Sequence, residues 1–276
     1  LKIYVKKVIS DDLTTKLIKL LLPYREINKL EKENNLLKNL IEYGVENDLG
    51  IKKSLIEIDF VSKLSELSVS GSNIIFNKYS PNKNILMRGI YNKIPGSAYL
   101  EKNNNKIFLL SSTGVLGYAN YNNSKLSFRQ VMNNINDYID EDQFLKSQKF
   151  AVRDILLFDD KIFVSFTNER KSDCWNMSLI FSDISYNNID FKPLFIPDEC
   201  VSSKNNIDKV FEGLQAGGRI VGFKNNHILL TTGEFRSRSR AQQKHSTLGK
   251  IIKINYKNKT YEIVAMGTRN AQGLYF

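Results

Sequence analysis

The chain has 276 residues and a mass of 31.8 kDa, enough for one large domain or two ordinary ones. Hydrophobic residues make up 42% of it and charged residues 25%, which excludes a wholly disordered chain, and no apolar stretch approaches the length of a membrane span. The net charge of +11 favours an anionic partner such as phospholipid headgroups, an acidic polysaccharide or a nucleic acid, and a solvated basic surface is the alternative.

Residues 1–70 have a helical period and are predicted to form an N-terminal helical segment or stalk ahead of a β domain over 72–276. Asp11 and Asp12 can cap its first helix. Farther along, residues 27–41 show the 3-4-3-4 spacing of a heptad seam. Because the repeat lasts about two heptads, two interpretations stay open: an amphipathic helix that packs on its own domain, and a stalk that forms oligomers.

From about Ser72 the period of the apolar residues changes to two, and short β-rich runs alternate with Asn, Asp, Gly and Ser. This pattern predicts an all-β, antiparallel architecture. The predicted strands are 73–76, 106–110, 117–121, 154–158, 161–166, 177–181, 227–231, 250–254 and 261–264.

Three segments, 96–112, 152–167 and 219–233, share one layout: an apolar strand, a polar turn and a second strand that ends in small or hydroxylated residues. They recur at intervals of about 50 to 65 residues, which suits propeller blades with insertions better than a sandwich. Residues 72–276 would hold about four blades. Since the sequence stops inside the apolar run 273–276, we expect it to be part of a longer chain, with the propeller incomplete at its C-terminus.

The chain has two cysteines, Cys174 and Cys200, on either side of a predicted strand, turn and strand. A disulfide that closes this loop in an oxidising compartment and a pair of partly buried free thiols are both open. The two histidines and two cysteines lie too far apart in sequence for a zinc motif.

Four stretches near the C-terminal end carry a family resemblance: 217–221, 227–234, 248–255 and 267–274. Gly217-Gly218-Arg219 opens a strand, and Gly267-Thr268-Arg269-Asn270 follows the last predicted strand. Their order and spacing resemble the glucose/sorbosone dehydrogenase family, which includes the soluble quinoprotein glucose dehydrogenases and the aldose sugar dehydrogenases. The resemblance is strong over about residues 213–276 and weak over 96–182. It implies a six-bladed β-propeller that binds pyrroloquinoline quinone (PQQ) on its axis and oxidises the C1 hydroxyl of aldoses, with calcium polarising the quinone.

The resemblance also implies roles for single residues. Gln215 stands where the family has the histidine that removes the proton from the sugar hydroxyl, and a glutamine cannot accept that proton near neutral pH. Glu234 stands in place of the acidic partner of that histidine. Without the histidine, Glu234 has the alternative of bonding a backbone turn, and Arg219 is expected to join neighbouring blades more often than to bind a ligand.

Arg269 and Asn270 match the residues that contact the quinone, whose three carboxylates suit a planar guanidinium. An anion-binding central pocket and a purely structural role are equally open for this pair. The upstream glutamine that contacts the quinone has no clear counterpart, and Gln148 and Lys149 are the nearest candidates. The calcium ligands are expected beyond Phe276.

A run of alternating arginines and serines, with Arg236, Arg238 and Arg240, follows Glu234 directly. It is a candidate grip for a sulfate, phosphate or uronate, with an exposed, solvated loop as the alternative. Nucleic acid is not expected, because no aromatic residues alternate with the arginines. His245, just after this run, is as readily a surface residue as a catalytic one.

Three functions follow from these observations. The first is a PQQ- and calcium-dependent sugar dehydrogenase with an altered base. The second is a non-catalytic propeller that binds a carbohydrate, such as an anionic polysaccharide, or a protein at the cell surface. The third is a membrane-tethered assembly factor that oligomerises through 27–41. The absent histidine favours the second over the first, and the expected location is the periplasm or the cell exterior, with membrane proximity through the N-terminal segment.

Overall fold

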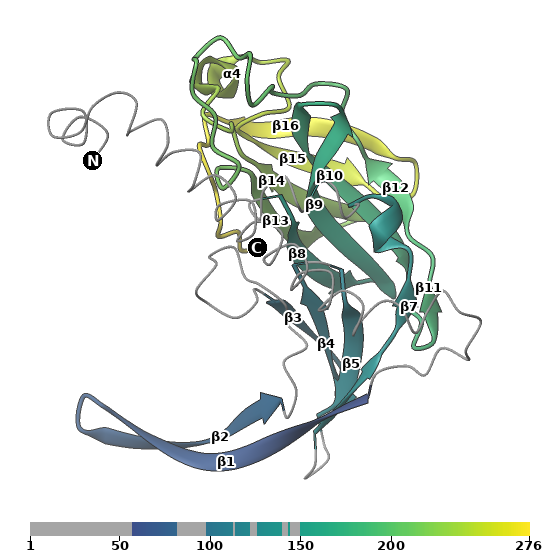
Figure 1. The fold of residues 1–276 in the computed structure, drawn as a ribbon, viewed down its shortest axis with the longest axis vertical. Coiled ribbons are helices and arrows are strands. Elements are labelled where there is room, and N and C mark those ends of the chain that lie inside the picture. Colours follow the sequence, from purple (N-terminus) through teal and green to yellow (C-terminus); the bar gives the residue numbers. More distant parts are fainter. Residues whose placement is uncertain (1–56, 82–97, 113, 122–125, 140–142, 144–149) are drawn as a thin grey trace, which may run out of the picture. The chain divides into compact units, whose positions relative to one another are not determined.

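The computed structural model describes residues 57–81, 98–112, 114–121, 126–139, 143 and 150–276. More than half of these residues lie in strands β1 to β16, and they also include the 3-10 turn η2 (Ile135–Asp137) and the short helix α4 (Arg238–Gln242) (Figure 1). The prediction of an all-β architecture is confirmed. Within this part of the chain, no helix is long and apolar enough to cross a membrane.

The predicted helical segment falls mostly on residues 1–56, outside the described residues. Where it overlaps them, the prediction is wrong, because Glu57–Val69 is strand β1. Leu64 and Leu67 are spaced by three, as on a helix face, which hides the strand in the sequence. In a strand, this spacing puts the two leucines on opposite faces.

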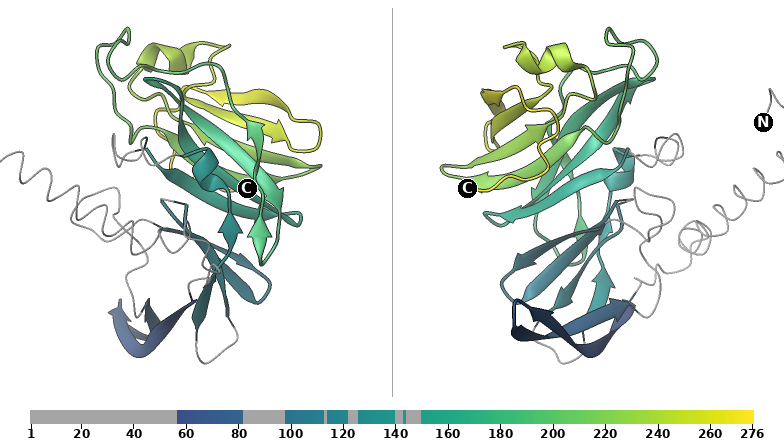
Figure 2. Two further views of the ribbon diagram at one scale, coloured as in Figure 1. Left: turned by 45° about the vertical axis from the view of Figure 1, so that its right-hand side comes forward. Right: turned by 90° about the vertical axis from the view of Figure 1, so that its left-hand side faces the viewer.

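The described strands form three antiparallel sheets and one small parallel pair (Figure 2). The first sheet has the order β2-β1-β6-β5-β4-β3, and its strands are β1 (Glu57–Val69), β2 (Ser72–Pro81), β3 (Ala98–Asn103), β4 (Lys106–Ser111), β5 (Leu116–Asn120) and β6 (Ser127–Gln130). The second has the order β12-β10-β9-β8, with β8 (Val152–Phe158), β9 (Lys161–Lys171), β10 (Cys174–Asp183) and β12 (Lys192–Phe195).

The third sheet has the order β13-β14-β15-β16, with β13 (Gly217–Phe223), β14 (His227–Thr232), β15 (Lys250–Asn255) and β16 (Thr260–Met266). The parallel pair is β7 (Met132–Asn133) with β11 (Asn188–Ile189). The innermost strands β3, β8 and β13 neighbour one another, so the sheets are arranged as successive blades of a partial propeller. The described residues hold three four-stranded units of this kind, where the sequence indicated about four, and the β1–β2 hairpin continues the first.

Local chemistry explains the hairpins within the blades. Strands β8 and β9 are joined by Asp159 and Asp160, both with positive φ (54° and 57°), the conformation of a type I′ turn that Asp and Asn tolerate. The turn between β13 and β14 covers residues 224–226, and its Asn225 and Asn226 also have positive φ, 58° and 62°. All nine predicted strands lie within strands of the structure or within one residue of them.

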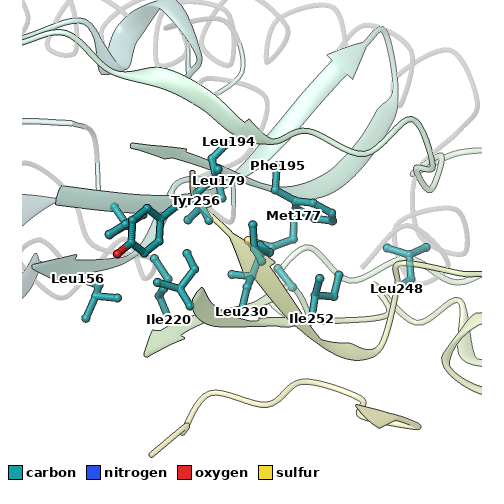
Figure 3. Packing of buried hydrophobic residues seen from close by; sticks show 14 of the residues in the cluster. Leu156, Met177, Leu179, Leu194, Phe195, Ile220, Leu230, Leu248, Ile252 and Tyr256 are labelled. Atoms are coloured by element: carbon teal, nitrogen blue, oxygen red, sulfur yellow. The ribbon is translucent and has the colours of Figure 1, made fainter. Parts of the chain in front are cut away.

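The middle sheet is buried on both faces, and its side chains alternate between two cores. Phe163 packs toward the third sheet, in a cluster that includes Leu230 and Ile252. Figure 3 shows these two residues among the others of the cluster that it labels. On either side of Phe163 in the sequence, Ile162 and Val164 pack toward the first sheet. A strand that is buried on both faces needs consecutive apolar residues rather than an alternating pattern. Strand β9 has such a run, residues 162–164.

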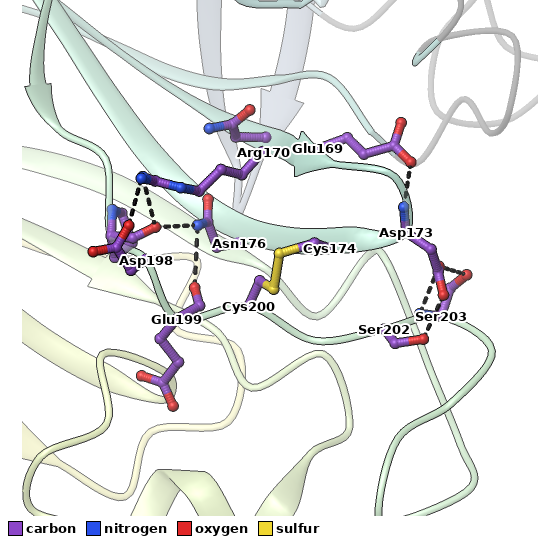
Figure 4. Close-up of a disulfide and its surroundings, with 12 residues drawn as sticks. Glu169, Arg170, Asp173, Cys174, Asn176, Asp198, Glu199, Cys200, Ser202 and Ser203 are labelled. Atoms are coloured by element: carbon purple, nitrogen blue, oxygen red, sulfur yellow. Dashed lines mark hydrogen bonds and ion pairs between the residues drawn. A yellow bond between two sulfur atoms is a disulfide. The ribbon is translucent and has the colours of Figure 1, made fainter.

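Cys174, at the start of β10, forms a disulfide with Cys200, so of the two alternatives the structure has the bridge (Figure 4). The bridge anchors the loop that leads from β12 to β13. Two carboxylates, those of Asp173 and Glu199, anchor the same loop. Asp173 accepts hydrogen bonds from Ser202 and Ser203, which outweigh the effect of burial and lower its pKa to about 2.

Candidate functional site

The site lies where the third sheet begins, at a close contact between strands. Gly217 and Gly218 have φ of 70° and 107°, in the left-handed region that favours glycine. A Cβ on Gly218 would lie 2.4 Å from the Cβ of Arg153 in β8. Gly218 is therefore required to let β13 pass this close to the neighbouring inner strand, whereas a Cβ on Gly217 would meet the backbone of Thr232 and Gly233 in its own sheet.

Backbone hydrogen bonds bring three separate segments together beside these glycines. The amide of Phe235 donates to the carbonyl of Gln215 over 3.0 Å, which joins the loop after β14 to the segment before β13. The amide of Glu234 donates to the carbonyl of Arg269 over 3.1 Å, which adds the segment after β16. The site residues named from the family motifs are thus gathered by main-chain bonds.

The side chains of these segments also meet. Arg269 donates from Nε to Oε1 of Gln215 over 3.3 Å, and the same Nε lies 3.6 Å from Oε1 of Glu234. Gln215, Glu234 and Arg269 therefore line one place, as the family resemblance implies. The side chain of Arg269 is 57% exposed, and its terminal nitrogens have no partner among the described residues, so they remain able to bind an anion.

Glu234 is 3% exposed, and its Oε1 has no hydrogen-bond partner. Burial raises the pKa of its carboxyl, against the opposing effect of Arg269 and Arg238. Ionising this carboxyl is costly in the absence of a donor, so a ligand that supplies a hydrogen bond would stabilise it. A buried carboxyl with a raised pKa and an oxygen without a hydrogen bond has the properties of a general base.

Two more buried polar atoms near Glu234 lack partners within the described part of the chain: Oδ2 of Asp208 and Nε of Arg236. Both residues act electrostatically on the Glu234 carboxyl, Asp208 raising its pKa and Arg236 lowering it. Native structures leave few such atoms unpaired, and those that remain commonly mark the position of a water or a ligand. The loop ends around Glu234 therefore offer donors and acceptors to a polar ligand.

The side chains of Asn270 and Arg219 already make hydrogen bonds within the protein, which leaves them fewer groups for a ligand. Oδ1 of Asn270 accepts the amide of Gly217 over 3.0 Å, which leaves only the NH₂ of its side chain for a ligand. Arg219 donates to Oδ1 of Asp154 over 2.8 Å and to the carbonyl of Gln272 over 2.7 Å. Arg219 therefore joins the second and third sheets, which is the role that the sequence favoured for it over ligand binding.

The arginine run splits in two. Arg240, in α4, pairs with Oε1 of Glu199 over 2.6 Å, so the structure corrects its grouping with Arg236 and Arg238 as a free anion grip. Arg238 is exposed, and no hydrogen bond is recorded for it in the described residues. His245 is exposed too, at the surface of the same loop.

Two residues that sequence reasoning missed hold this loop in place. Glu199 also accepts hydrogen bonds from Ser246 and from the amide and hydroxyl of Thr247. Lys250 is fully buried and donates from Nζ to the carbonyls of Arg240, Ala241 and Leu248 over 2.8 to 2.9 Å. Lys250 lies in one of the stretches that carry the family resemblance and Glu199 does not, but in neither case does the local sequence indicate a partner in a distant loop.

The donor chemistry present fits a planar, polycarboxylated cofactor at one end: Arg269 provides a guanidinium, and Asn270 an amide NH₂. Gln148 and Lys149 lie outside the described residues. No group of three or more His, Cys, Asp or Glu residues that could hold a metal occurs in the described ranges.

Residues 159–276 match the sequence model of the family described as glucose / sorbosone dehydrogenase. The resemblance to this family is confirmed, and it extends well upstream of residue 213. None of the curated proteins matches the chain.

Several solved structures are similar at low identity. A glucose dehydrogenase is 14% identical with a TM-score of 0.42, covering 57% of this chain and 44% of that one. The soluble aldose sugar dehydrogenase of Escherichia coli, in the apo form, is 16% identical with a TM-score of 0.41, covering 59% and 44%. The PQQ-bound aldose sugar dehydrogenase of Streptomyces coelicolor is 13% identical with a TM-score of 0.40, covering 62% and 47%. The chain spans about half the length of these relatives, and its likeness to the family rests on the sequence match of residues 159–276.

Proposed function

We propose that this chain is the site-bearing part of a sugar dehydrogenase of the glucose/sorbosone type, which oxidises a CH–OH group of an aldose with PQQ as cofactor. The family match of residues 159–276 supports the reaction class. The observation that carries the proposal is the position of Arg269, whose Nε lies 3.3 Å from Oε1 of Gln215 and 3.6 Å from Oε1 of Glu234, although the three residues come from separate segments of the chain.

Arg269 and Asn270 would hold the carboxylates of the quinone, since a guanidinium can bind a carboxylate through two parallel hydrogen bonds. When bound, the quinone supplies the acceptor for the two electrons that leave the alcohol. Calcium is part of this proposal only through the family resemblance.

The step that the chain's own residues would carry out is the removal of the proton from the sugar hydroxyl. Oxidation of an alcohol to a carbonyl releases one proton from the hydroxyl and one hydride from carbon, and the proton needs a base within hydrogen-bond reach. Gln215 cannot be that base, but its amide can orient the hydroxyl. We assign the proton to Oε1 of Glu234, which is buried and unpartnered and has a raised pKa.

The surroundings of the site extend the proposal to substrate and location. Arg236 and Arg238 add positive charge beside Glu234, which supports a sugar or polysaccharide that carries an anionic group. The Cys174–Cys200 disulfide supports an oxidising compartment, the periplasm or the cell exterior.

A second candidate function is a propeller that binds carbohydrate without turning it over. The observation that favours it is Gln215 itself, because every other named site residue could serve binding as well as catalysis. The two functions differ in one measurable property, which is electron transfer from the sugar.

The experiment uses the longest natural chain that contains this sequence, loaded with PQQ and calcium and assayed by dye reduction with neutral and acidic aldoses. We expect turnover that Glu234→Gln lowers by about 100-fold or more, the usual effect of removing a general base. Gln215→His should raise turnover, and Arg240→Gln is the matched control that leaves the site's own arginines intact. Retained PQQ absorbance without turnover in every variant would instead establish a binding protein.

A further inference from the structure

The β1–β2 hairpin exposes an unusual amount of apolar surface. Seven large hydrophobic side chains on it are between 38% and 67% exposed: Leu64, Leu67, Val69, Ile74, Ile75, Phe76 and Tyr79. Single exposed hydrophobic residues are ordinary, but so many on one short element mark a surface that binds something. The hairpin is far from the motifs that define the sugar site in sequence, and nothing in the proposed reaction uses it.

The pairing register sorts these side chains between two faces. Leu67 lies opposite Ile74, Ser65 opposite Phe76 and Val69 opposite Ser72. Directly paired residues share a face, and residues two apart along a strand share it too. One face, which we call the apolar face, therefore carries Leu67, Val69, Ile74 and Phe76.

The charges on the hairpin are divided in the same way. Lys63 lies directly opposite Lys78, and both fall on the apolar face, next to Ser65 and Phe76. Over residues 62–79 this face has no acidic residue, and the single carboxylate, Glu66, is paired with Ile75 on the other face. That other face also carries Asn73 and Asn77 and is therefore more polar.

An apolar surface bordered by two lysines and free of carboxylates complements an anionic lipid surface. Apolar side chains gain free energy at the boundary between headgroups and acyl chains, and lysines beside them reach the phosphates with their ammonium groups. Like-charged Lys63 and Lys78 repel each other when placed directly opposite, and a layer of negative headgroups relieves that repulsion. The chain as a whole, at +11, is attracted to the same surface.

We propose that the apolar face of the β1–β2 hairpin docks the protein onto a membrane surface rich in anionic phospholipid. The contact is peripheral: Leu67, Val69, Ile74 and Phe76 enter the interface, and Lys63 and Lys78 lie at the headgroups. This proposal does not depend on catalysis, since it concerns a surface that the sugar site does not use.

The test is co-sedimentation of the full chain with vesicles of phosphatidylcholine alone and of phosphatidylcholine with phosphatidylserine in a 7:3 ratio. We expect binding to the anionic vesicles at low salt. Leu67→Ser with Ile74→Ser, the cross-strand pair of the apolar face, should weaken it by about tenfold. Lys63→Gln with Lys78→Gln should weaken it by roughly fivefold per lysine and remove the preference for phosphatidylserine.

The other face provides a matched control. Leu64→Ser with Ile75→Ser removes two residues of the same kind, each 67% exposed, and should change vesicle binding by less than about twofold. All four side chains are exposed, so the variants should keep the circular dichroism of the parent. Equal losses from both faces, no preference for anionic vesicles, or a dimer that apolar-face changes dissociate in sedimentation velocity would each overturn the proposal.

Discussion

Two arginine–carboxylate pairs of this protein have the same chemistry but differ in their hydrogen bonds. In the complete pair both carboxylate oxygens accept a hydrogen bond, and in the incomplete pair an oxygen has none. At the contact between the second and third sheets, Asp154 receives Nη1 of Arg219 at 2.8 Å and the amide of Ile220 at 2.9 Å. At the sugar site, Nε of Arg269 stops 3.6 Å from Glu234, whose Oε1 has no hydrogen bond. Burial raises the pKa of both carboxyls, so their difference lies in their partners.

The difference separates what holds the fold from what is kept ready for a ligand. A carboxylate with both oxygens bonded is costly to disturb, because its removal leaves buried donors without an acceptor. A buried carboxylate with an unbonded oxygen lowers stability and is retained where activity needs it. Three changes test this separation, from the largest expected effect to the smallest.

The largest effect should come from the loss of the Cys174–Cys200 disulfide. Replacing Cys174 and Cys200 by serine opens a loop whose ends are 26 residues apart, and chain entropy predicts a loss of about 3.5 kcal/mol in the free energy of unfolding. Urea unfolding of the double variant measures this. Reduced wild-type protein should match the variant, and a reductant should leave the variant unchanged. A loss below about 1 kcal/mol would mean that the loop is held by Asp173 and Glu199 without the bridge.

Breaking the complete pair should cost somewhat less. Asp154→Ala leaves Arg219 and the amide of Ile220 without their acceptor, and we expect a loss of about 2 to 3 kcal/mol, because the arginine is partly exposed. Asp154→Asn keeps an acceptor for the amide and should lose about 1 kcal/mol. Thermal unfolding of both variants measures the difference. If alanine and asparagine cost the same, the hydrogen bonds at this contact contribute little.

Changing the incomplete pair should have the smallest effect and the opposite sign. Glu234→Gln removes a buried charge that lacks a donor and should stabilise the ligand-free protein by about 1 kcal/mol at pH 7.5. Because the folded-state pKa of Glu234 is raised above its ordinary 4.5, the folded state binds the proton more tightly than the unfolded state does. The free energy of unfolding should therefore fall as the pH rises from 4.5 through the raised folded-state pKa. Unfolding at pH 4 and pH 7.5 should show that decline in wild type and a smaller one in the variant. A destabilised Glu234→Gln would contradict the comparison.

Much of this molecule follows from local sequence. The strands and the Asp-Asp and Asn-Asn turns are set by period and by residues that tolerate positive φ, so they were predictable. The meeting of Gln215, Glu234 and Arg269 followed from family motifs, because each stands directly beside a predictable strand.

What sequence could not supply was pairing between distant loops. Arg240 resembles Arg236 in sequence, yet it is neutralised by Glu199, 41 residues away, which no local pattern indicates. Asp208 was missed for the same reason, since it lies in an irregular loop. Strand β1 was mistaken because its leucines are spaced as in a helix; in the strand they lie on opposite faces, and both faces are exposed.

The buried ammonium of Lys250 does for its loop what a coordinated cation does elsewhere, since it satisfies three converging carbonyl oxygens. This corner of the protein therefore assembles without recruiting an ion from solution, and chelators should leave it intact. Amine-reactive reagents modify the exposed lysines first and will reach Lys250 only when the α4 loop opens. The rate at which Lys250 is acylated therefore measures the rate of that opening.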